Sequence, residues 1–452
     1  MKISQYRSKI SAALLLSTLL SGAVFGQTRE ITLQEAIDLS LDHSNALKIS
    51  ESQIAEASAI VQEARNSRLP DLDISGQYLR VNKPNLEIKI GGEQDDSDQE
   101  AEQGGGMPNV NQAMMGMASA SLPIFAGGRI SSGIASARYL EKAAKLDAQK
   151  DQLQVIQNTV AAYFNLYKAK AAVRVVSENL RSSQQRVKDF SNMEANGLLA
   201  RNDLLKVQLQ ESNLELALLT AENDQKVANF NFNLMLGLPE DTQLVLDSTV
   251  EVSLSLEGSL QEWEGKALEQ RADQKALEQR QLASHASVQA AKGDYFPSLA
   301  LTAGYVGIYV PHALTVTNAM NVGVGLSYNL ASLYKAGAHV KQAKAKEEAL
   351  HWNQEQLRDN IKVAIHKAYQ DLNQSREKIA VSEKALEQAV ENYRITKNKY
   401  DNSLATTTDL LDADVARLQT QIDYEYAKAD AMIAYYKLHE QAGVKVVSDT
   451  GK

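Results

Sequence analysis

The sequence contains one short segment twice, at a fixed separation. Residues 196–205 (NGLLARNDLL) and 402–411 (NSLATTTDLL) align at an offset of 206, and this offset holds without a gap over about 117 residues around them. Upstream, residues 259–297 align with residues 32–70 at an offset of 227. A chance match does not keep one register over such lengths, so we predict a chain built from two internal repeats.

Each copy of this segment is a brief loss of helical pattern between two long helical runs, which predicts the tip of a helical hairpin. Residues 129–195 carry apolar side chains at alternating spacings of three and four, with one series recurring every seventh residue at Leu146, Leu153, Val160 and Tyr167. This spacing is typical of coiled-coil packing. At ~1.5 Å per residue the run extends for roughly 100 Å, far more than a globular domain needs.

Two pairs of strands interrupt the helices. Residues 32–68 read as one helix that Pro70 ends, and the repeat places Pro297 in the same position before the third strand. Apolar and polar side chains then alternate, which predicts strands near residues 71–78, 115–125, 299–309 and 321–330. Strands of ~9 to 11 residues with alternating faces fit a transmembrane β-barrel. We read the tyrosines at 78, 305, 309 and 328 as a membrane-interface belt, with burial in a core as the alternative.

Four strands cannot close a barrel, since even small lipid-spanning barrels use ~8, and an open edge in hydrocarbon leaves backbone groups unsatisfied. The barrel must therefore be shared between subunits. Each long helix is nearly as long as the two shorter ones of its repeat taken together, so short helices stacked end to end beside it can form a helical wall that continues the barrel. A membrane barrel continued by a helical tube is a conduit.

These patterns predict five segments along the chain. Residues 1–26 form a signal peptide with a basic start, an apolar run and a small-residue cleavage site. The first repeat covers 27–237, a connector of β-strand character covers 238–258, the second repeat covers 259–443, and a flexible tail covers 444–452.

The composition narrows the class of protein. The chain has no Cys, so the exported product has neither a disulfide nor a lipid-modified Cys, and no later stretch is apolar enough for a transmembrane helix. Loss of Lys2, Arg7 and Lys9 with the signal peptide changes the formal charge from −9 to −12. Nucleic acid and anionic membrane surfaces are therefore not expected as partners.

An acidic, glycine-rich segment in the first repeat, residues 82–112, has no counterpart in the second. It accounts for the difference between the two offsets if it is an insertion. We expect an exposed loop on the outside of the cell, and we expect deletion of residues 91–106 to leave assembly and export unchanged.

The chain resembles the TolC-like outer-membrane efflux family over essentially its whole mature length. The resemblance rests on the duplicated order of helix, two strands, long helix, tip and helix, on Pro70 and Pro297, and on the Asp-Leu-Leu that follows each tip. It implies a mainly α protein with membrane β-structure, in which a homotrimer forms a barrel of about 12 strands above a coiled-coil tunnel. It further implies an outer-membrane location in a Gram-negative bacterium, in contact with lipid and with a long periplasmic extension.

The resemblance also implies the function and the partners. Such a chain is the passive exit duct of a tripartite efflux pump or a type I secretion system, and it carries small molecules or proteins. Its partners are a periplasmic adaptor protein and an inner-membrane transporter of the RND, ABC or MFS type.

Site residues are carried over position by position, as two groups. The pore constriction comprises Tyr400, Asp409, Asp412 and Asp203. The adaptor-contact tips comprise Asn196, Gly197, Leu198, Leu199, Ser403, Leu404 and Ala405. Some family members have an Arg at the position of Ala405 that helps to hold the aperture shut, so we expect a different or weaker closing network here.

Other interpretations stay open beside these. Thr406 and Asp409 form a T-x-x-D pattern, so Asp409 is also explained as a helix-start residue, as is Asp203. The alternative function is a periplasmic coiled-coil adaptor or scaffold without a channel. We expect no enzyme activity, no cofactor and no metal site, because the seven His lack ligand spacing and the S-x-x-K motif at Ser375 has no companion motif.

Overall fold

The computed structural model describes residues 28–80, 82, 111–247, 258–311 and 313–445. The expected signal peptide, nearly all of the acidic segment, about half of the expected connector and most of the expected tail lie outside them. The chain divides into two compact units. The first comprises Met1–Ser52, Leu146–Lys275 and Gln356–Lys452, and the second comprises Gln53–Lys145 and Ala276–Glu355.

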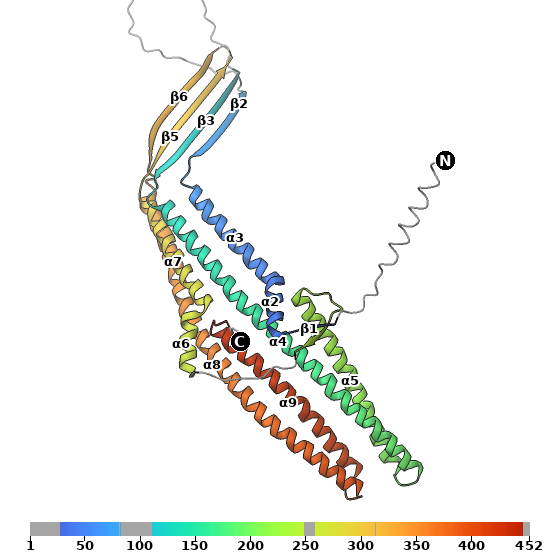
Figure 1. Ribbon diagram of the computed structural model, residues 1–452. Coiled ribbons are helices and arrows are strands. Elements are labelled where there is room, and N and C mark those ends of the chain that lie inside the picture. The colour runs from blue at the N-terminus through green and yellow to red at the C-terminus, as the bar shows by residue number, and fades with distance from the viewer. Residues whose placement is uncertain (1–27, 81, 83–110, 248–257, 312, 446–452) are drawn as a thin grey trace, which may run out of the picture. The chain divides into compact units, whose positions relative to one another are not determined.

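Two long helical hairpins dominate the first unit (Figure 1). Helix α4 (Arg129–Ala195) is followed by α5 (Arg201–Leu236), and α8 (Ser332–Asp401) is followed by α9 (Thr407–Gln441). The parts of α4 and α8 in this unit run to the tips. Both hairpins expected from the sequence are confirmed, with their turns at the two copies of the repeated segment.

The helix expected over residues 32–68 is broken in two, which corrects the sequence reading. Helix α2 (Leu33–His43) ends at Ser44 and α3 (Asn45–Asn66) begins beside it. In the second half, α6 (Leu260–Gln270) and α7 (Ala272–Lys292) break at Arg271.

At both breaks the chain lies close against a glycine. A Cβ atom on Gly237, after α5, would lie 2.5 Å from the His43 ring, and one on Gly443, after α9, would lie 2.9 Å from the Cα of Arg271. Both glycines have left-handed backbones, with φ of 69° and 72°, which a glycine adopts without strain. The two short helices therefore end where they meet the ends of the returning helices.

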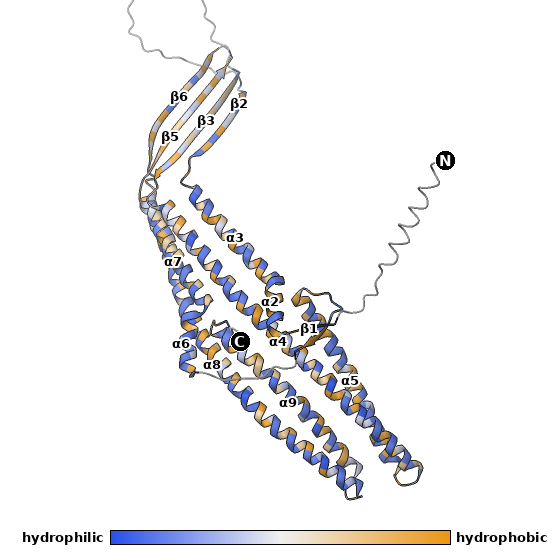
Figure 2. Ribbon diagram, in the orientation of Figure 1, coloured by the Kyte–Doolittle hydropathy of each residue, from blue (hydrophilic) through white to orange (hydrophobic). Residues whose placement is uncertain are grey.

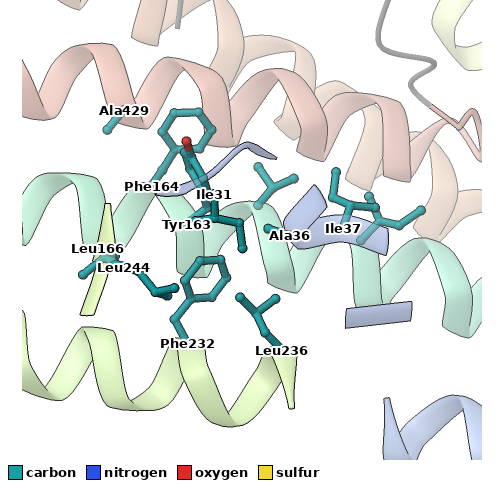
Figure 3. Packing of buried hydrophobic residues seen from close by; sticks show 12 residues of the cluster. Ile31, Ala36, Ile37, Tyr163, Phe164, Leu166, Phe232, Leu236, Leu244 and Ala429 are labelled. Atoms are coloured by element: carbon teal, nitrogen blue, oxygen red, sulfur yellow. The ribbon is translucent and has the colours of Figure 1, made fainter. Parts of the chain in front are cut away.

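The main core of the first unit lies where α2, α4 and α5 meet a small parallel sheet (Figure 3). Strands β1 (Thr28–Ile31) and β4 (Gln243–Leu246) pair in register, although they are more than 200 residues apart in the sequence. Tyr163 and Phe232 pack edge to face with ring centroids 6.1 Å apart. Burial raises the pKa of Tyr163 to about 12. The sequence did not predict β1 or its pairing.

The second unit contains an antiparallel sheet in the order β2-β3-β5-β6, and its strands lie side by side in Figure 1. They span Asp71–Arg80 (β2), Gln112–Phe125 (β3), Ser298–Val310 (β5) and Leu314–Ser327 (β6). The fourth strand begins and ends earlier than expected. Residues 328–330 instead form a turn into α8, in which the Asn329 side chain accepts a 3.0 Å hydrogen bond from the backbone N–H of Ala331.

The register places most of the large apolar side chains of the four strands on one face. Ile74 lies opposite Ala118, Ala118 opposite Tyr305, and Tyr305 opposite Met320. Ile74 is 90% exposed, and hydrophobic residues recur along these strands in Figure 2. The other face mixes small and polar residues such as Ser75 and Ser119 with apolar ones such as Met117 and Val306. The alternation predicted from the sequence is therefore aligned across the sheet.

Helices of the second unit meet in a consistent order. Ser58 of α3 donates to Glu141 of α4 at 3.2 Å, and Ser136 of α4 contacts Ser287 of α7 at 3.1 Å. His285 of α7 contacts Glu347 of α8 at 2.8 Å. The order α3-α4-α7-α8 thus matches the strands to which these helices are joined. None of the helices in the described ranges is both long and apolar enough to cross a membrane.

Candidate functional site

The two hairpin tips share one backbone geometry. After α4, the N–H of Leu198 donates to the carbonyl of Met193 at 2.8 Å; after α8, the N–H of Leu404 donates to that of Lys399 at 2.7 Å. This 6→1 bond, with a left-handed residue before it, closes a helix C-terminus. Asn196 and Asn402 add matching side-chain bonds of 2.6 and 2.7 Å to the carbonyls of the residues four before them.

Gly197 and Ser403 occupy the left-handed position of the two tips, with φ of 73° and 61°. A Cβ atom on Gly197 would meet nothing within 4 Å, so glycine is favoured there by its backbone and not by lack of space. Ser403 adopts the same conformation at the steric cost that a side chain brings. The sequence difference between the tips leaves their backbone shape unchanged.

The tips direct two large apolar side chains into solvent. Leu198 is 74% exposed and Leu404 is 77% exposed. Leu199 instead packs against the core cluster of the tips, which contains Phe190 and Leu204, and Ala405 is half-buried. Of the expected contact residues, Leu198 and Leu404 therefore present the largest accessible apolar surface.

Asp409 begins α9 in a reciprocal cap. Its carboxylate accepts hydrogen bonds from the backbone N–H and the hydroxyl of Thr406, at 2.8 and 2.7 Å, and its own N–H donates to that hydroxyl at 3.2 Å. These bonds lower the pKa of Asp409. The helix-start interpretation of Asp409 is confirmed. Its carboxylate is also exposed, so the cap does not remove its charge from the surface.

Asp412 lies one turn further along α9 and is exposed. Within the described ranges no ion pair holds its carboxylate. Asp203 at the start of α5 pairs with Lys206 at 3.1 Å, and the same ammonium reaches the hydroxyl of Thr408 at 3.4 Å. Lys206 thereby connects the two hairpins beside the tips.

Tyr400 stacks on Phe190 of the other hairpin, with ring centroids 5.5 Å apart and planes 6° from parallel. Burial raises the pKa of Tyr400. A cavity of about 680 Å³ lies between the tips, and Leu198, Asp203, Lys206, Tyr400 and Thr408 are among its lining residues. The structure thus brings Tyr400 and Asp203 together in one place.

A buried charge network above the tips was not predicted from the sequence. Asp414 of α9, 4% exposed, accepts 2.8 Å hydrogen bonds from Arg186 of α4 and from Arg417 of α9. Arg186 is 9% exposed and also donates to the hydroxyl of Tyr393 of α8 at 3.2 Å. Asn179 of α4 accepts a 3.0 Å bond from Arg417.

This network joins both hairpins, and one signal in the sequence could have found it. Asp414 and Arg417 follow Leu410 at spacings of four and three, where the apolar pattern of α9 calls for core residues. A charged residue at a core position usually has a partner, because an unpaired buried charge is costly.

A second set of polar contacts joins α4 to α9. Glu425 accepts hydrogen bonds from Tyr167 at 2.8 Å and from Arg174 at 3.2 Å. Burial opposes ionisation of Glu425, but hydrogen bonds from Lys428 and Tyr167 outweigh it and the pKa is lowered. Asp430 pairs with Lys168 of α4 and with Lys378 of α8.

The hairpin tips provide an exposed apolar surface for docking and carry negative charge. Among the described residues, no three His, Asp or Glu side chains are grouped as ligands for a metal ion. The tips combine an exposed apolar residue on each hairpin, acidic side chains nearby, and hydrogen bonds and ion pairs between the hairpins.

Comparison with known proteins gives a consistent result. The profile of the outer membrane efflux protein family matches residues 36–238 and 263–444. The chain is 21% identical over 338 residues to the outer membrane efflux protein BepC of Brucella suis, a match that covers 73% of this chain and 72% of BepC.

Solved structures share its fold. The Campylobacter jejuni CmeC outer membrane channel has a TM-score of 0.75 at 18% identity, with 91% of this chain and 85% of CmeC covered. The outer membrane protein VceC of Vibrio cholerae has a TM-score of 0.73 at 18% identity, with 91% and 96% covered. These relatives are outer-membrane proteins and not adaptors.

Proposed function

The chain belongs to the outer membrane efflux protein family, and we propose that three copies of it form a passive exit duct across the outer membrane. The observation that carries this proposal is the four-stranded sheet. Most of its large apolar side chains share one face, and β2 and β6 each have one edge without a partner strand among the described residues.

Closure of the sheet requires further copies. In hydrocarbon the unpaired N–H and C=O groups of β2 and β6 must find partners, and β6 of one copy can pair with β2 of the next. Three copies supply about 12 strands, enough for a closed barrel. The two sequence repeats then supply alternate pairs of strands around the ring.

The helical hairpins need neighbours for a similar reason. Helix α5 exposes apolar side chains at a coiled-coil spacing, namely Leu205, Leu209, Leu216, Leu219, Phe230 and Leu234. A stripe of this kind on a helix is unusual in a monomer and fits a helix of another copy. The helices of three copies would then form the wall of a tunnel below the barrel.

The tips are proposed as the docking site for a periplasmic adaptor, which links the duct to an inner-membrane transporter. Leu198 and Leu404 offer apolar anchors at the end of each hairpin, and Asn196, Gly197, Leu199, Ser403 and Ala405 set the shape around them. Three copies present six such tips. Because the two tips of one chain have the same backbone geometry, one adaptor surface can fit both.

The pore constriction is proposed at Tyr400, Asp409, Asp412 and Asp203. Ala405 cannot supply the ionic tie that an Arg would at this position. We assign the closing contacts instead to Lys206, which reaches Thr408, and to the pair between Arg186 and Asp414.

Two measurements test the proposal. The protein purified from outer-membrane fractions should crosslink to a trimer in detergent and should conduct ions in planar bilayers; a water-soluble monomer would contradict the proposal.

For docking, Leu198→Glu combined with Leu404→Glu should abolish export while trimers still form. The matched control, Leu198→Met with Leu404→Met, keeps the apolar surface and should export normally. Export by the Glu variant would show that the adaptor docks elsewhere.

A further inference from the structure

The buried charge network around Asp414 contains more positive than negative charge. Among the described residues, Asp414 supplies the one carboxylate that pairs with Arg186 and with Arg417, at 2.8 Å from each. Both guanidiniums stay charged, because arginine is not deprotonated in proteins. The ring of Tyr393 lies 4.3 Å from Arg417 and its hydroxyl lies 3.2 Å from Arg186, and these contacts add no formal negative charge. One positive charge of the network is therefore left without a counter-charge.

Three polar atoms of the same network lack a hydrogen-bond partner. They are Nη1 of Arg186, Nε of Arg417 and Oγ of Ser183, and they are three of the eight such buried side-chain atoms in the described part of the chain. Ser183 is fully buried, and its hydroxyl does not bond the carbonyl of the preceding turn, as that of Ser182 does at 3.1 Å. A buried donor without an acceptor is costly, so three at one place indicate a ligand that accepts hydrogen bonds.

Ser183 lies between the two contacts that the arginines make across the helices. Asn179, Ser183 and Arg186 follow one another on α4 at spacings of four and three, which places them on one face. Arg417 reaches Asn179 at one end of this row at 3.0 Å, and Asp414 accepts from Arg186 at the other end. The unpartnered atoms thus belong to one stretch of the α4–α9 contact, roughly 10 Å long.

A small anion satisfies both the excess charge and the unpartnered donors. It accepts hydrogen bonds and donates none, whereas a water molecule brings two hydrogens of its own that need acceptors. The close packing of a protein interior favours a monatomic ion over a phosphate or a carboxylate. We propose that Ser183 and Arg186 of α4, together with Arg417 of α9, bind a chloride ion.

The ion adds a contact between the two hairpins, because α4 and α9 belong to different ones. It lies beside the pair of Arg186 with Asp414, to which we have assigned part of the closing contacts. Bound chloride should therefore favour the closed duct. This consequence rests on the proposed function, while binding of the ion does not.

Thermal unfolding of the full-length protein in detergent tests the binding. Sodium chloride, sodium bromide and sodium isethionate are compared at equal ionic strength. Chloride and bromide should each raise the unfolding temperature by about 2–4 °C over isethionate, and the rise should saturate with concentration. In crystals soaked with bromide, anomalous scattering should appear beside the Ser183 hydroxyl. The same unfolding temperature in all three salts would overturn the proposal.

Two variants locate the ion. Ser183→Ala removes one donor but keeps both guanidiniums, so the chloride concentration that gives half of the effect should rise about ten-fold. Arg417→Gln removes the excess charge, and its unfolding temperature should not respond to chloride. The matched controls Ser182→Ala and Arg394→Gln change exposed residues of α4 and α8 and should respond as wild type does. A wild-type response in Ser183→Ala and Arg417→Gln would assign the effect to ions at the surface and overturn the proposal.

Planar bilayers separate the anion site from the duct. Chloride is more mobile than isethionate and by itself raises the conductance of a pore, so a lower wild-type conductance in chloride is the sign of closure. Ser183→Ala should reverse this order. Conducting trimers whose unfolding ignores chloride would refute the anion site and leave the duct intact. A protein that chloride stabilises but that does not conduct would refute the duct and leave the anion site intact.

Discussion

The carboxylate of Asp414 accepts a 2.8 Å hydrogen bond from the guanidinium of Arg186, and both side chains are almost completely buried between α9 and α4. Arg417 shares the same carboxylate and lies over the Tyr393 ring at 4.3 Å from its centroid. One acid therefore compensates two buried or half-buried cations that belong to different hairpins.

Replacement of Asp414 by Asn should loosen this contact strongly. It leaves two guanidiniums without a counter-charge, and removing one partner of a buried pair costs about 3–5 kcal/mol. Thermal unfolding should occur at a markedly lower temperature, and bilayer conductance should rise as the hairpins separate. The control Glu391→Gln removes an exposed pair with Arg394 on α8 and should change neither. If the Asp414→Asn trimer is less stable but conducts as the wild type does, the network stabilises the fold and does not hold the hairpins closed.

Thr406→Ala should destabilise the start of α9 by about 1 kcal/mol, the usual cost of a lost N-cap. The Thr406 hydroxyl accepts a hydrogen bond from the N–H of Asp409 and donates one to its carboxylate, and both are lost in the variant. Hydrogen exchange of the first turn of α9 is the direct measurement, and it should increase. Thr408→Ala, two residues on, lacks a capping role and should leave that exchange unchanged.

Asp412→Asn should reduce the preference of the channel for cations. An exposed carboxylate without an ionic partner contributes its full charge to a ring around the proposed opening. The permeability ratio of potassium to chloride in planar bilayers should fall several-fold, and block by a trivalent cation should weaken. Asp409→Ala combined with Asp412→Ala should abolish both effects. If the double variant keeps the cation selectivity and the block, the only role left for Asp409 is to cap the start of α9.

His439 should make the first unit sensitive to acid. Burial against Trp263 and Tyr435 lowers the pKa of His439, with ring centroids 5.0 and 4.4 Å away. Since the pKa in the folded state lies below the unfolded value of about 6.5, this contribution to stability is complete above about pH 6.5 and is lost as the pH falls below it.

The measurement is thermal unfolding between about pH 7.5 and pH 5. His439→Phe keeps an aromatic ring against Trp263 but cannot take up a proton, so the loss of stability on acidification should become smaller. The same substitution at His366, which is exposed on α8, should preserve the wild-type pH dependence. If His439→Phe loses as much thermal stability on acidification as the wild type does, other groups cause the pH dependence.

Sequence periodicity was enough to locate the hairpins, the strands and their apolar faces. The spacing of three and four along α4, the alternation in β5 and the T-x-x-D pattern at Thr406 are local, because a helix or strand repeats its own geometry along the chain. The duplicated register also led to the same tip at Gly197 and Ser403. These features follow from neighbours in the sequence.

Tertiary contacts decided the rest. The helix breaks at Ser44 and Arg271 arise where these turns press on Gly237 and Gly443, roughly 190 and 170 residues away in the sequence. Strand β1 exists because β4 pairs with it, and Asp414 is a buried charge because Arg186 lies across from it. A local pattern carries no information about such distant partners. The sequence therefore determined the long hairpins and the strands of the β2-β3-β5-β6 sheet, while three-dimensional packing determined β1, the points where helices break and which charges meet.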